Sequence, residues 1–385
     1  MSTAIADSTT SAHPAPDGGP APQRPASPVK IGLGLVGAGL VIWAMMNIFL
    51  AFAFYPEKFG SKIVIGLLAI VIGVGGAALF FYFLNMFVEG LPGRVSDVVI
   101  PYAFLVPGLG LIVLMLVYPA VQTINYSFAN SESTAYVGFD NYVAIFKDPE
   151  FRQSIFNNVL WLIIVPAVTV ALGVVVAVLS DKLSQRGEKV AKAIIFLPMA
   201  ISFVGASAIW SLVYFYNNPG QTQIGLLNAI WTALGGDPQT WLRNSDFRLN
   251  SILMMVILIW LQVGFAMILL SSAIKGVPED TLEAARIDGA TELQIFTQVI
   301  IPQIKGTIIT VFITVVILVL KVFDIVYVLT NGAAKSNVIA NLFFNELFAN
   351  DQAGRASAIV VILLLAVLPI LVYQVRHFRQ EEMNR

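Results

Sequence analysis

The stretch EAARIDGATELQIFTQVIIP, residues 283–302, lies between two long apolar runs and mixes charged residues, small residues and a glycine. Pro278 stands shortly before it, and proline suits a first helical turn because its missing N–H would be unpaired there anyway. Glu279 and Asp280 place negative charge at the positive end of the helix dipole. The sequence therefore predicts a short helix that begins at Pro278.

Gly289 predicts where this first helix ends, because glycine readily adopts the left-handed conformation that terminates helices. Thr291 and Gln294 have the T-x-x-Q spacing of a capping box, so a second helix should begin there and run to Pro302. The segment is therefore expected to form two helices with a corner between them. The second helix has an apolar stripe that we expect to pack against the inner end of a helix bundle. This stripe consists of Leu293, Phe296 and Ile300.

The first helix carries small residues that would let the surface of another protein approach its backbone closely. They are Ala284, Ala285 and Gly289, while Glu283 and Arg286 supply charge at the edges for pairing. The alternative is an amphipathic helix that only lies at a membrane interface. The physical pattern alone leaves both interpretations open.

The composition of the whole chain excludes several classes of protein. Hydrophobic residues make up 57% of the 385 residues and charged residues only 12%, against roughly 25% charged in soluble domains. The net charge of -1 and the lack of a basic block argue against a nucleic-acid partner. Without cysteine, and with only His13 and His377, no disulfide, thiolate or zinc cluster is expected. So apolar a chain needs a lipid bilayer.

Eight segments are long and apolar enough to cross a hydrocarbon core, which takes about 20 residues. The predicted fold class is therefore an all-α integral membrane protein with eight transmembrane helices. The segments are approximately 31–54, 63–88, 98–122, 157–180, 193–216, 251–274, 307–330 and 356–374.

The two ends of the chain are predicted to be cytoplasmic. Residues 1–30 contain six prolines and six alanines, a composition that cannot offset the entropy of ordering, so we predict a disordered tail. The run 31–54 is too long for the core of a cleavable signal and should stay in the membrane. Loop 181–192, with four basic residues, is interpreted as a solvated loop that sets this topology, as are the basic residues after Tyr373.

The segment around Gly289 resembles the permease subunits of bacterial binding-protein-dependent ABC importers. Their signature is E-A-A-x3-G, nine further residues, then an aliphatic residue, any residue, an aliphatic residue and proline. The residues that fill it here are Glu283, Ala284, Ala285, Gly289, Val299, Ile301 and Pro302.

The resemblance implies that residues 275–306 form a cytoplasmic coupling loop whose first helix docks into a separate ATPase. The chain itself would bind no cofactor, and ATP and Mg would be held by a partner ABC ATPase dimer. The other implied partners are a second homologous permease subunit and an extracytoplasmic sugar-binding protein, in a bacterial cytoplasmic (inner) membrane. The implied ATPase-coupling residues are Glu283, Ala284, Ala285, Arg286, Asp288 and Gly289.

Two further stretches point to the carbohydrate branch of that family. VGFDNYVAIFKDPEFRQSIFNN (137–158) resembles the first outer loop of maltose-type permeases, and KVFDIVYVLTNG (321–332) resembles their helix after the coupling loop. The substrate class implied is α-glucosides or maltose-like oligosaccharides. Two helices ahead of a six-helix core also resemble the larger maltose-type subunit, although no large outer domain is inserted here, and NGAA at 331–334 replaces the common N-G-G-P.

These patterns divide the chain into four predicted parts. They are a cytoplasmic tail (1–30), two peripheral transmembrane helices (31–97), a permease core (98–375) and a second cytoplasmic tail (376–385).

A candidate substrate path follows from the polar residues of the seventh predicted helix. Lys321 and Asp324 are spaced i, i+3 and would share a face. A charge at a helix centre costs about 2.5–3.5 kcal/mol unless it is paired or hydrated, so both should face protein or water. Tyr327 continues the stripe, and positions aligned with maltose-type sugar sites add Gln262 and Phe265. The alternative is a structural Lys–Asp pair, and Gln262 could equally serve helix packing.

The leading hypothesis is an importer permease without catalysis of its own. The chain has no G-x-x-x-x-G-K-[ST] motif, so nucleotide should be bound by another chain and this chain is not an enzyme. The competing hypothesis is an ion-coupled secondary transporter in which Lys321 and Asp324 carry the coupling ion. A membrane-embedded enzyme ranks last, because no cluster of acid, base or nucleophile is present at one helix end.

Overall fold

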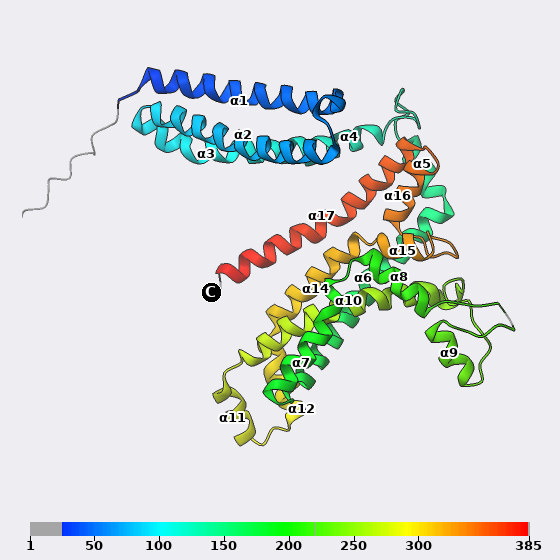
Figure 1. Ribbon diagram of the computed structural model, residues 1–385. Coiled ribbons are helices and arrows are strands. Elements are labelled where there is room, and N and C mark those ends of the chain that lie inside the picture. The colour runs from blue at the N-terminus through cyan, green and yellow to red at the C-terminus, as the bar shows by residue number, and fades with distance from the viewer. Residues whose placement is uncertain (1–24, 219, 384–385) are drawn as a thin grey trace, which may run out of the picture. The chain divides into compact units, whose positions relative to one another are not determined.

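The computed structural model describes residues 25–218 and 220–383 (Figure 1). This described part is helical, with one isolated bridge between Ala129 and Tyr136. Six of its helices are long and apolar enough to cross a membrane, and the number rises to eight if each of two bent helix pairs is one span. The predicted all-α class and its eight spans are confirmed in this form, while most of the predicted tail 1–30 lies outside the described residues.

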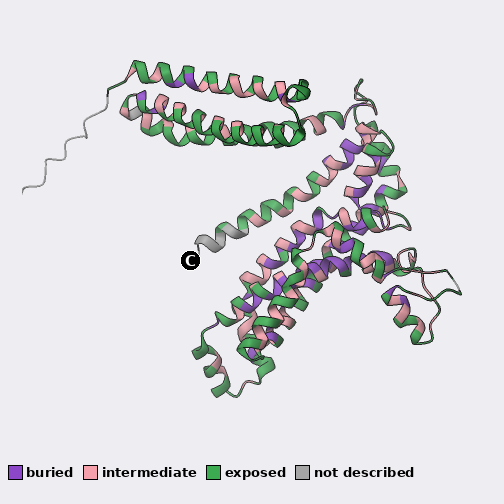
Figure 2. Cartoon of the chain, in the orientation of Figure 1, coloured by how far each residue is buried: buried purple, intermediate pink, exposed green. Residues whose placement is uncertain are grey.

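The chain forms two compact units, Met1–Pro119 and Ala120–Arg385, and the predicted boundary after residue 97 stays a prediction. In the first unit the long helices α1 and α2 form a close hairpin in which a Cβ on Gly37 would lie 2.2 Å from the Phe83 ring. Most of the apolar surface of this unit is exposed (Figure 2), as suits helices that face lipid. Its elements are α1 (Pro28–Phe54), η1 (Pro56–Phe59), α2 (Lys62–Gly90), α3 (Gly93–Ile112) and η2 (Val113–Val117), which α4 (Tyr118–Tyr126) continues.

The second unit is built around the long helices α6 and α10. A Cβ on Gly173 of α6 would lie 2.7 Å from Ala266 of α10, so the glycine allows the two helices to approach closely. The elements are α5 (Asp140–Lys147), α6 (Pro149–Asp181), α7 (Gln185–Phe196), η3 (Leu197–Ala200), α8 (Phe203–Val213), α9 (Leu226–Ala233), η4 (Asp246–Arg248), α10 (Leu249–Lys275), α11 (Glu279–Ile287), α12 (Glu292–Gln294), η5 (Ile295–Ile300), α13 (Ile301–Gln303), α14 (Lys305–Leu320), α15 (Asp324–Leu329), α16 (Ile339–Phe348) and α17 (Ala353–Met383).

The predicted helix 193–216 is bent sharply in its middle. The pair Gln185–Ala200 and Phe203–Val213 meets at an angle of 103°. Pro198 lies in the last turn before the bend, and Ser202 caps the new helix by accepting a hydrogen bond from the Gly205 N–H at 3.1 Å. The bend therefore has a local cause on both sides.

The predicted continuous helix 307–330 is wrong. Helix α14 ends at Leu320, and α15 begins only at Asp324. Phe323, at φ -143° and ψ -61°, leaves the helical conformation and stacks on Tyr327 with ring centroids 5.1 Å apart. No proline or glycine marks this break, so tertiary packing overrides the local helix preference of the sequence.

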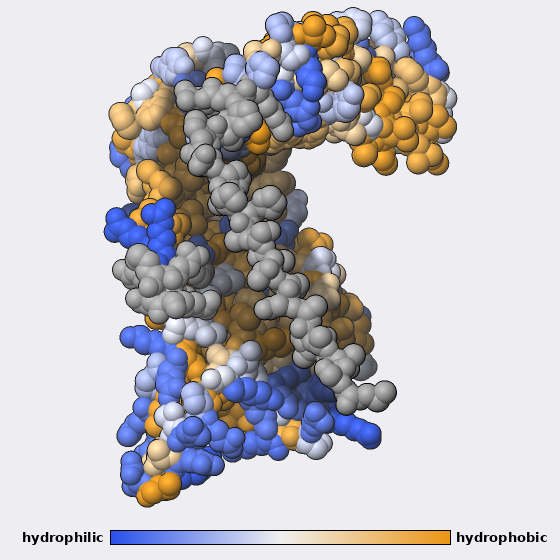
Figure 3. Space-filling view, turned by 90° about the vertical axis from the view of Figure 1, so that its left-hand side faces the viewer, coloured by the Kyte–Doolittle hydropathy of each residue, from blue (hydrophilic) through white to orange (hydrophobic). Residues whose placement is uncertain are grey.

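Hydrophilic residues gather at the end of the second unit that carries α11 and α12, as Figure 3 shows from the side. The same end holds the turn between α6 and α7 and the end of α10 (Figure 1). The coupling loop 275–306 and loop 181–192 therefore share one end of the bundle.

Candidate functional site

The coupling loop forms the predicted pair of helices with a corner. Helix α11 begins at Glu279, with Pro278 as the residue just before its first turn. Gly289 has φ +81°, and a Cβ added at this position would meet no neighbouring atom within 4 Å. Glycine is therefore required here by the left-handed backbone conformation and not by lack of space. The capping box is present: the Gln294 N–H donates to Thr291 Oγ1 at 3.4 Å, and the Thr291 N–H donates to Gln294 Oε1 at 2.8 Å.

The predicted coupling residues are mostly accessible in this structure. Most of them are exposed, and only Ala285 is half-buried. Arg286 pairs with Glu292 at 3.2 Å, whereas Glu283 and Asp288 have no ion-pair partner in the described part of the chain. The exposed residues are Glu283, Ala284, Arg286, Asp288 and Gly289.

The predicted apolar stripe of the second helix is wrong at Leu293, which is 72% exposed, while Ile295 is buried. The chain continues after the capping box as the π-helical turn η5. Its wider turn changes which residues face the bundle. Leu293 thus joins Ile287, which is 86% exposed, as a large apolar side chain at this charged end. Ile287 is not among the predicted coupling residues, because a single apolar residue in a short helix is by itself no signal of a contact surface.

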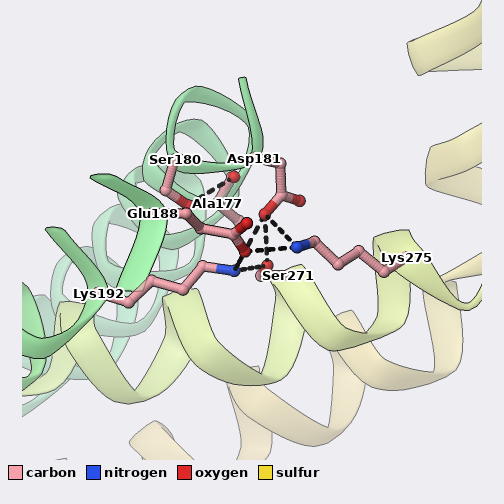
Figure 4. Close-up of polar contacts among 7 residues, drawn as sticks. All are labelled: Ala177, Ser180, Asp181, Glu188, Lys192, Ser271 and Lys275. Carbon is pink, nitrogen blue, oxygen red and sulfur yellow. Dashed lines mark hydrogen bonds and ion pairs between the residues drawn. The ribbon is translucent and has the colours of Figure 1, made fainter. Parts of the chain in front are cut away.

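A cluster of ion pairs lies directly beside the coupling loop (Figure 4). Lys192 of α7 lies 2.6 Å from Glu188 and 3.0 Å from Asp181 of α6. Lys275, at the end of α10, also contacts Glu188 and lies 3.6 Å from Asp181. The Ser271 hydroxyl donates to Asp181 at 2.8 Å. These five residues, called the α6–α7–α10 cluster below, fasten three helices together just before α11.

The interpretation of loop 181–192 as a solvated basic loop agrees with the exposure of Lys182, Arg186 and Lys189, but it is wrong for Lys192. The Lys192 side chain is only 19% exposed, because two carboxylates and a serine surround its ammonium group. The i, i+4 spacing of Glu188 and Lys192 on a helix is the signal that the sequence offered. The contacts with Asp181 and Lys275 depend on the packing of separate helices.

A cavity of about 470 Å³ opens at the sharp bend between η3 and α8. Gln262 and Asp324, two predicted path residues, both line it. Gln262 is 4% exposed, and its Oε1 atom has no hydrogen-bond partner within the described residues. A buried acceptor without a partner is costly, so this amide needs a ligand or water. The lining residues are Met199, Ile201, Ser202, Phe203, Val204, Leu261, Gln262, Leu318 and Asp324.

Lys321 lies near this cavity but on a different element from Asp324. Both residues line a small adjoining space of about 20 Å³. The break between α14 and α15 separates them, so the predicted common helical face is wrong. No salt bridge joins the two side chains among the ion pairs of the described chain, and the alternative of a structural Lys–Asp pair finds no support.

Phe265 and Tyr327 lie elsewhere. Phe265 packs against the buried cluster that contains Met267 and Val311, and it is not one of the residues that line the cavity at the bend. Tyr327 is 40% exposed and contacts the rings of Phe323 and Phe344. The structure thus brings Gln262, Asp324 and Lys321 together and leaves the two aromatic residues outside.

The pattern of the family described as binding-protein-dependent transport system inner membrane component matches residues 169–379. This range includes the coupling loop, the α6–α7–α10 cluster and the cavity at the bend. The chain belongs to this family of membrane transport permeases, and the resemblance predicted from the E-A-A-x3-G segment is confirmed.

Individual relatives match nearly over their full lengths. The alpha-glucoside transport system permease protein AglF of Rhizobium meliloti (strain 1021) is 44% identical over 335 residues, which are 83% of this chain and 98% of the relative. The osmoprotective compounds uptake permease protein GgtC of Synechocystis sp. (strain ATCC 27184 / PCC 6803 / Kazusa) is 47% identical over 282 residues, 73% of this chain and 100% of the relative.

A solved structure shares the fold. A chain of the bacterial alginate ABC transporter, in complex with an alginate pentasaccharide-bound periplasmic protein, has a TM-score of 0.63 at 21% identity. The match covers 73% of this chain and 94% of that chain.

Proposed function

We propose that this chain is the membrane permease subunit of an ATP-driven ABC importer whose substrates are α-glucosides or maltose-like oligosaccharides. The observation that carries the substrate class is the 44% identity to an alpha-glucoside permease over 83% of the chain. The cavity at the bend adds a chemical argument, because sugar hydroxyls can donate to the unpartnered Gln262 Oε1 and to the Asp324 carboxylate.

Energy is supplied by a partner ATPase dimer that holds ATP and Mg. The exposed face of α11, with Glu283 and Ala284, provides the docking surface, and Ile287 and Leu293 add apolar contact area. A surface that combines exposed apolar side chains with charged ones, at one end of a membrane helix bundle, is suited to contact with another protein. The second homologous permease and an extracytoplasmic sugar-binding protein complete the importer, and both termini of this chain are cytoplasmic.

Movement of α11 reaches the cavity through α10 and the α6–α7–α10 cluster. Lys275 ends α10, which carries Gln262 more than three turns away. Glu188 and Lys192 lie on α7, which leads into the bend beside the same cavity. A displacement at the ATPase therefore moves both walls of the cavity together. Alternating access follows as rigid-body movement around this site.

A second candidate substrate class is the osmoprotective compounds named for the relative GgtC, which is 47% identical. Both classes use the same site and the same energy source. A competition experiment with unlabelled compounds of each class separates them by affinity.

The test is uptake into proteoliposomes that contain this chain, its second permease and its ATPase, with the binding protein added outside. Labelled maltose and trehalose serve as probes. We expect uptake only with ATP inside, and none with a hydrolysis-deficient ATPase subunit as the matched control. Uptake that continues without ATP and follows an imposed proton or sodium gradient would overturn the proposal in favour of the ion-coupled transporter.

A further inference from the structure

A second cavity, of about 570 Å³, lies at the opposite end of α8 from the bend. This volume falls within the range of about 300–1,000 Å³ that is usual for small-molecule sites. The function proposed above assigns no role to it. Its lining comes from the end of α8, the loop after α8, the segment before η4, and the turn after α15. The residues used below are Tyr214, Tyr216, Thr240, Trp241, Arg243 and Thr330.

Several hydrogen-bond donors of this cavity have no partner. The Trp241 Nε1 atom is buried and makes no hydrogen bond. The Arg243 guanidinium, the Tyr216 hydroxyl and the Thr240 hydroxyl also form no hydrogen bond or ion pair within the described residues. Tyr214 is different, because its hydroxyl donates to the Leu253 carbonyl at 2.9 Å. The indole N–H of Trp241 is itself covered, so the donors that a ligand in the cavity can reach are those of Tyr216, Thr240 and Arg243.

The aromatic surface is held in place by a neighbouring ring. Trp231 contacts Trp241 edge to face, with centroids 6.1 Å apart and planes at 79°. Trp241 therefore offers a fixed ring at low entropic cost on binding. Among the described residues that line the cavity, none is acidic. Flat aromatic surface beside several hydrogen-bond donors suits a ligand with an apolar face and many hydroxyl oxygens, which is the chemistry of a sugar.

The two cavities lie at the two ends of the same helices. Phe203 and Val204 at the start of α8 line the cavity at the bend, whereas Ser211 lines the second cavity. Helix α8 has 11 residues, which corresponds to a length of about 16 Å at 1.5 Å per residue. On α15, Asp324 faces the first cavity, and the second is reached five residues later at Leu329.

We propose that the cavity around Trp241 and Arg243 is a second α-glucoside subsite on the outer side, which holds the sugar before it reaches Gln262. This inference rests on the function proposed above, including cytoplasmic termini, which place this end of α8 outside. Trp241 supplies its ring, and Arg243 donates to ring or hydroxyl oxygens of the sugar. Sugar would thus bind in turn at two sites along α8 and α15, first in the cavity around Trp241 and then in the cavity at the bend.

The test uses the complete complex of both permeases and the ATPase dimer in nanodiscs, without binding protein, and measures equilibrium binding of labelled maltotriose. Trp241→Ala should weaken binding about tenfold, and Trp241→Phe and Arg243→Gln about threefold each, because ring contacts and single hydrogen bonds have such values. Trp43→Phe is the matched control, since Trp43 lies on α1 and does not line the cavity. It should bind as the wild type does.

A second variant separates the two sites. Gln262→Ala should reduce ATP-driven uptake at least about tenfold, yet its complex should still bind maltotriose, and adding Trp241→Ala should weaken that remaining binding about tenfold. Unchanged binding in Trp241→Ala and Arg243→Gln, while the wild type binds and imports the sugar, would overturn this subsite and leave the proposed function intact. Variants that lose only affinity for the binding protein would also overturn it, because the surface then recognises protein. A wild-type complex that neither binds nor imports any α-glucoside would overturn both proposals.

Discussion

Lys275, the last residue of α10, contacts Glu188 in the first turn of α7. Lys275 itself lies four positions before α11 begins. The two residues are 87 positions apart in the chain. Their contact means that the base of the coupling loop is fastened to the helix that leads into the bend. The α6–α7–α10 cluster therefore links the base of the coupling loop to α7 in addition to the direct connection through α10.

Glu188→Gln should reduce the sugar imported per ATP hydrolysed, because both lysines lose a carboxylate partner. Changes along such a connection alter coupling by about 0.5–2 kcal/mol, which is about two- to thirtyfold. Uptake and hydrolysis are measured in the same proteoliposomes. Lys189→Gln is the control, since Lys189 is exposed on the same helix and outside the cluster. Equal ratios in both variants would remove the cluster from the coupling mechanism.

Gly289→Val should uncouple the ATPase from transport. A β-branched residue at φ +81° is strained, and the left-handed conformation costs about 1–2 kcal/mol for a residue with a Cβ, so the corner after α11 would shift. Hydrolysis should lose its stimulation by sugar-loaded binding protein, while membrane insertion stays normal. Gly276→Ala offers a comparison, because Gly276 has an ordinary helical φ of -79°. If sugar-loaded binding protein stimulated ATP hydrolysis in Gly289→Val as strongly as in the wild type, the corner after α11 would have no role in coupling.

Ile287→Asp and Leu293→Asp should weaken recovery of the ATPase with the solubilised permease. Both side chains are exposed apolar groups, and a carboxylate there would have to be desolvated in an interface. Glu283→Lys should act in the same direction through charge. Glu292→Gln is the control, since it removes only the exposed pair with Arg286, which is worth at most about 1 kcal/mol. Subunit ratios after affinity purification report the result.

Gln262→Leu should reduce uptake at least about tenfold and leave stability unchanged or raise it by about 1 kcal/mol, because a buried unpartnered oxygen is removed. Phe265→Leu should have a smaller effect, since Phe265 packs in the core and not at the cavity. Uptake kinetics and thermal unfolding of the purified complex test both. A larger loss of uptake in Phe265→Leu would place the sugar at Phe265 and outside the cavity at the bend.

Local signals allowed most of the coupling loop to be predicted. Gly289 and the capping box of Thr291 and Gln294 act through bonds between near neighbours, so the sequence carries them directly. The break after Leu320 could not be predicted in this way, because it depends on the packing of Phe323 against Tyr327 of α15 and Phe344 of α16. The same holds for Lys275, whose acidic partners are more than 80 positions distant.

The 103° bend between Ala200 and Phe203 has a consequence for the bilayer. Irregular backbone is tolerated at membrane depth only where protein or water meets its polar groups, and this bend lines the cavity of Gln262. If this cavity holds the sugar as proposed, we expect water to meet its polar groups before the sugar arrives. Each transport cycle would then exchange that water for substrate hydroxyls at Gln262 and Asp324, and a compound that cannot replace those hydrogen bonds would be rejected by the cost of dehydration rather than by its shape.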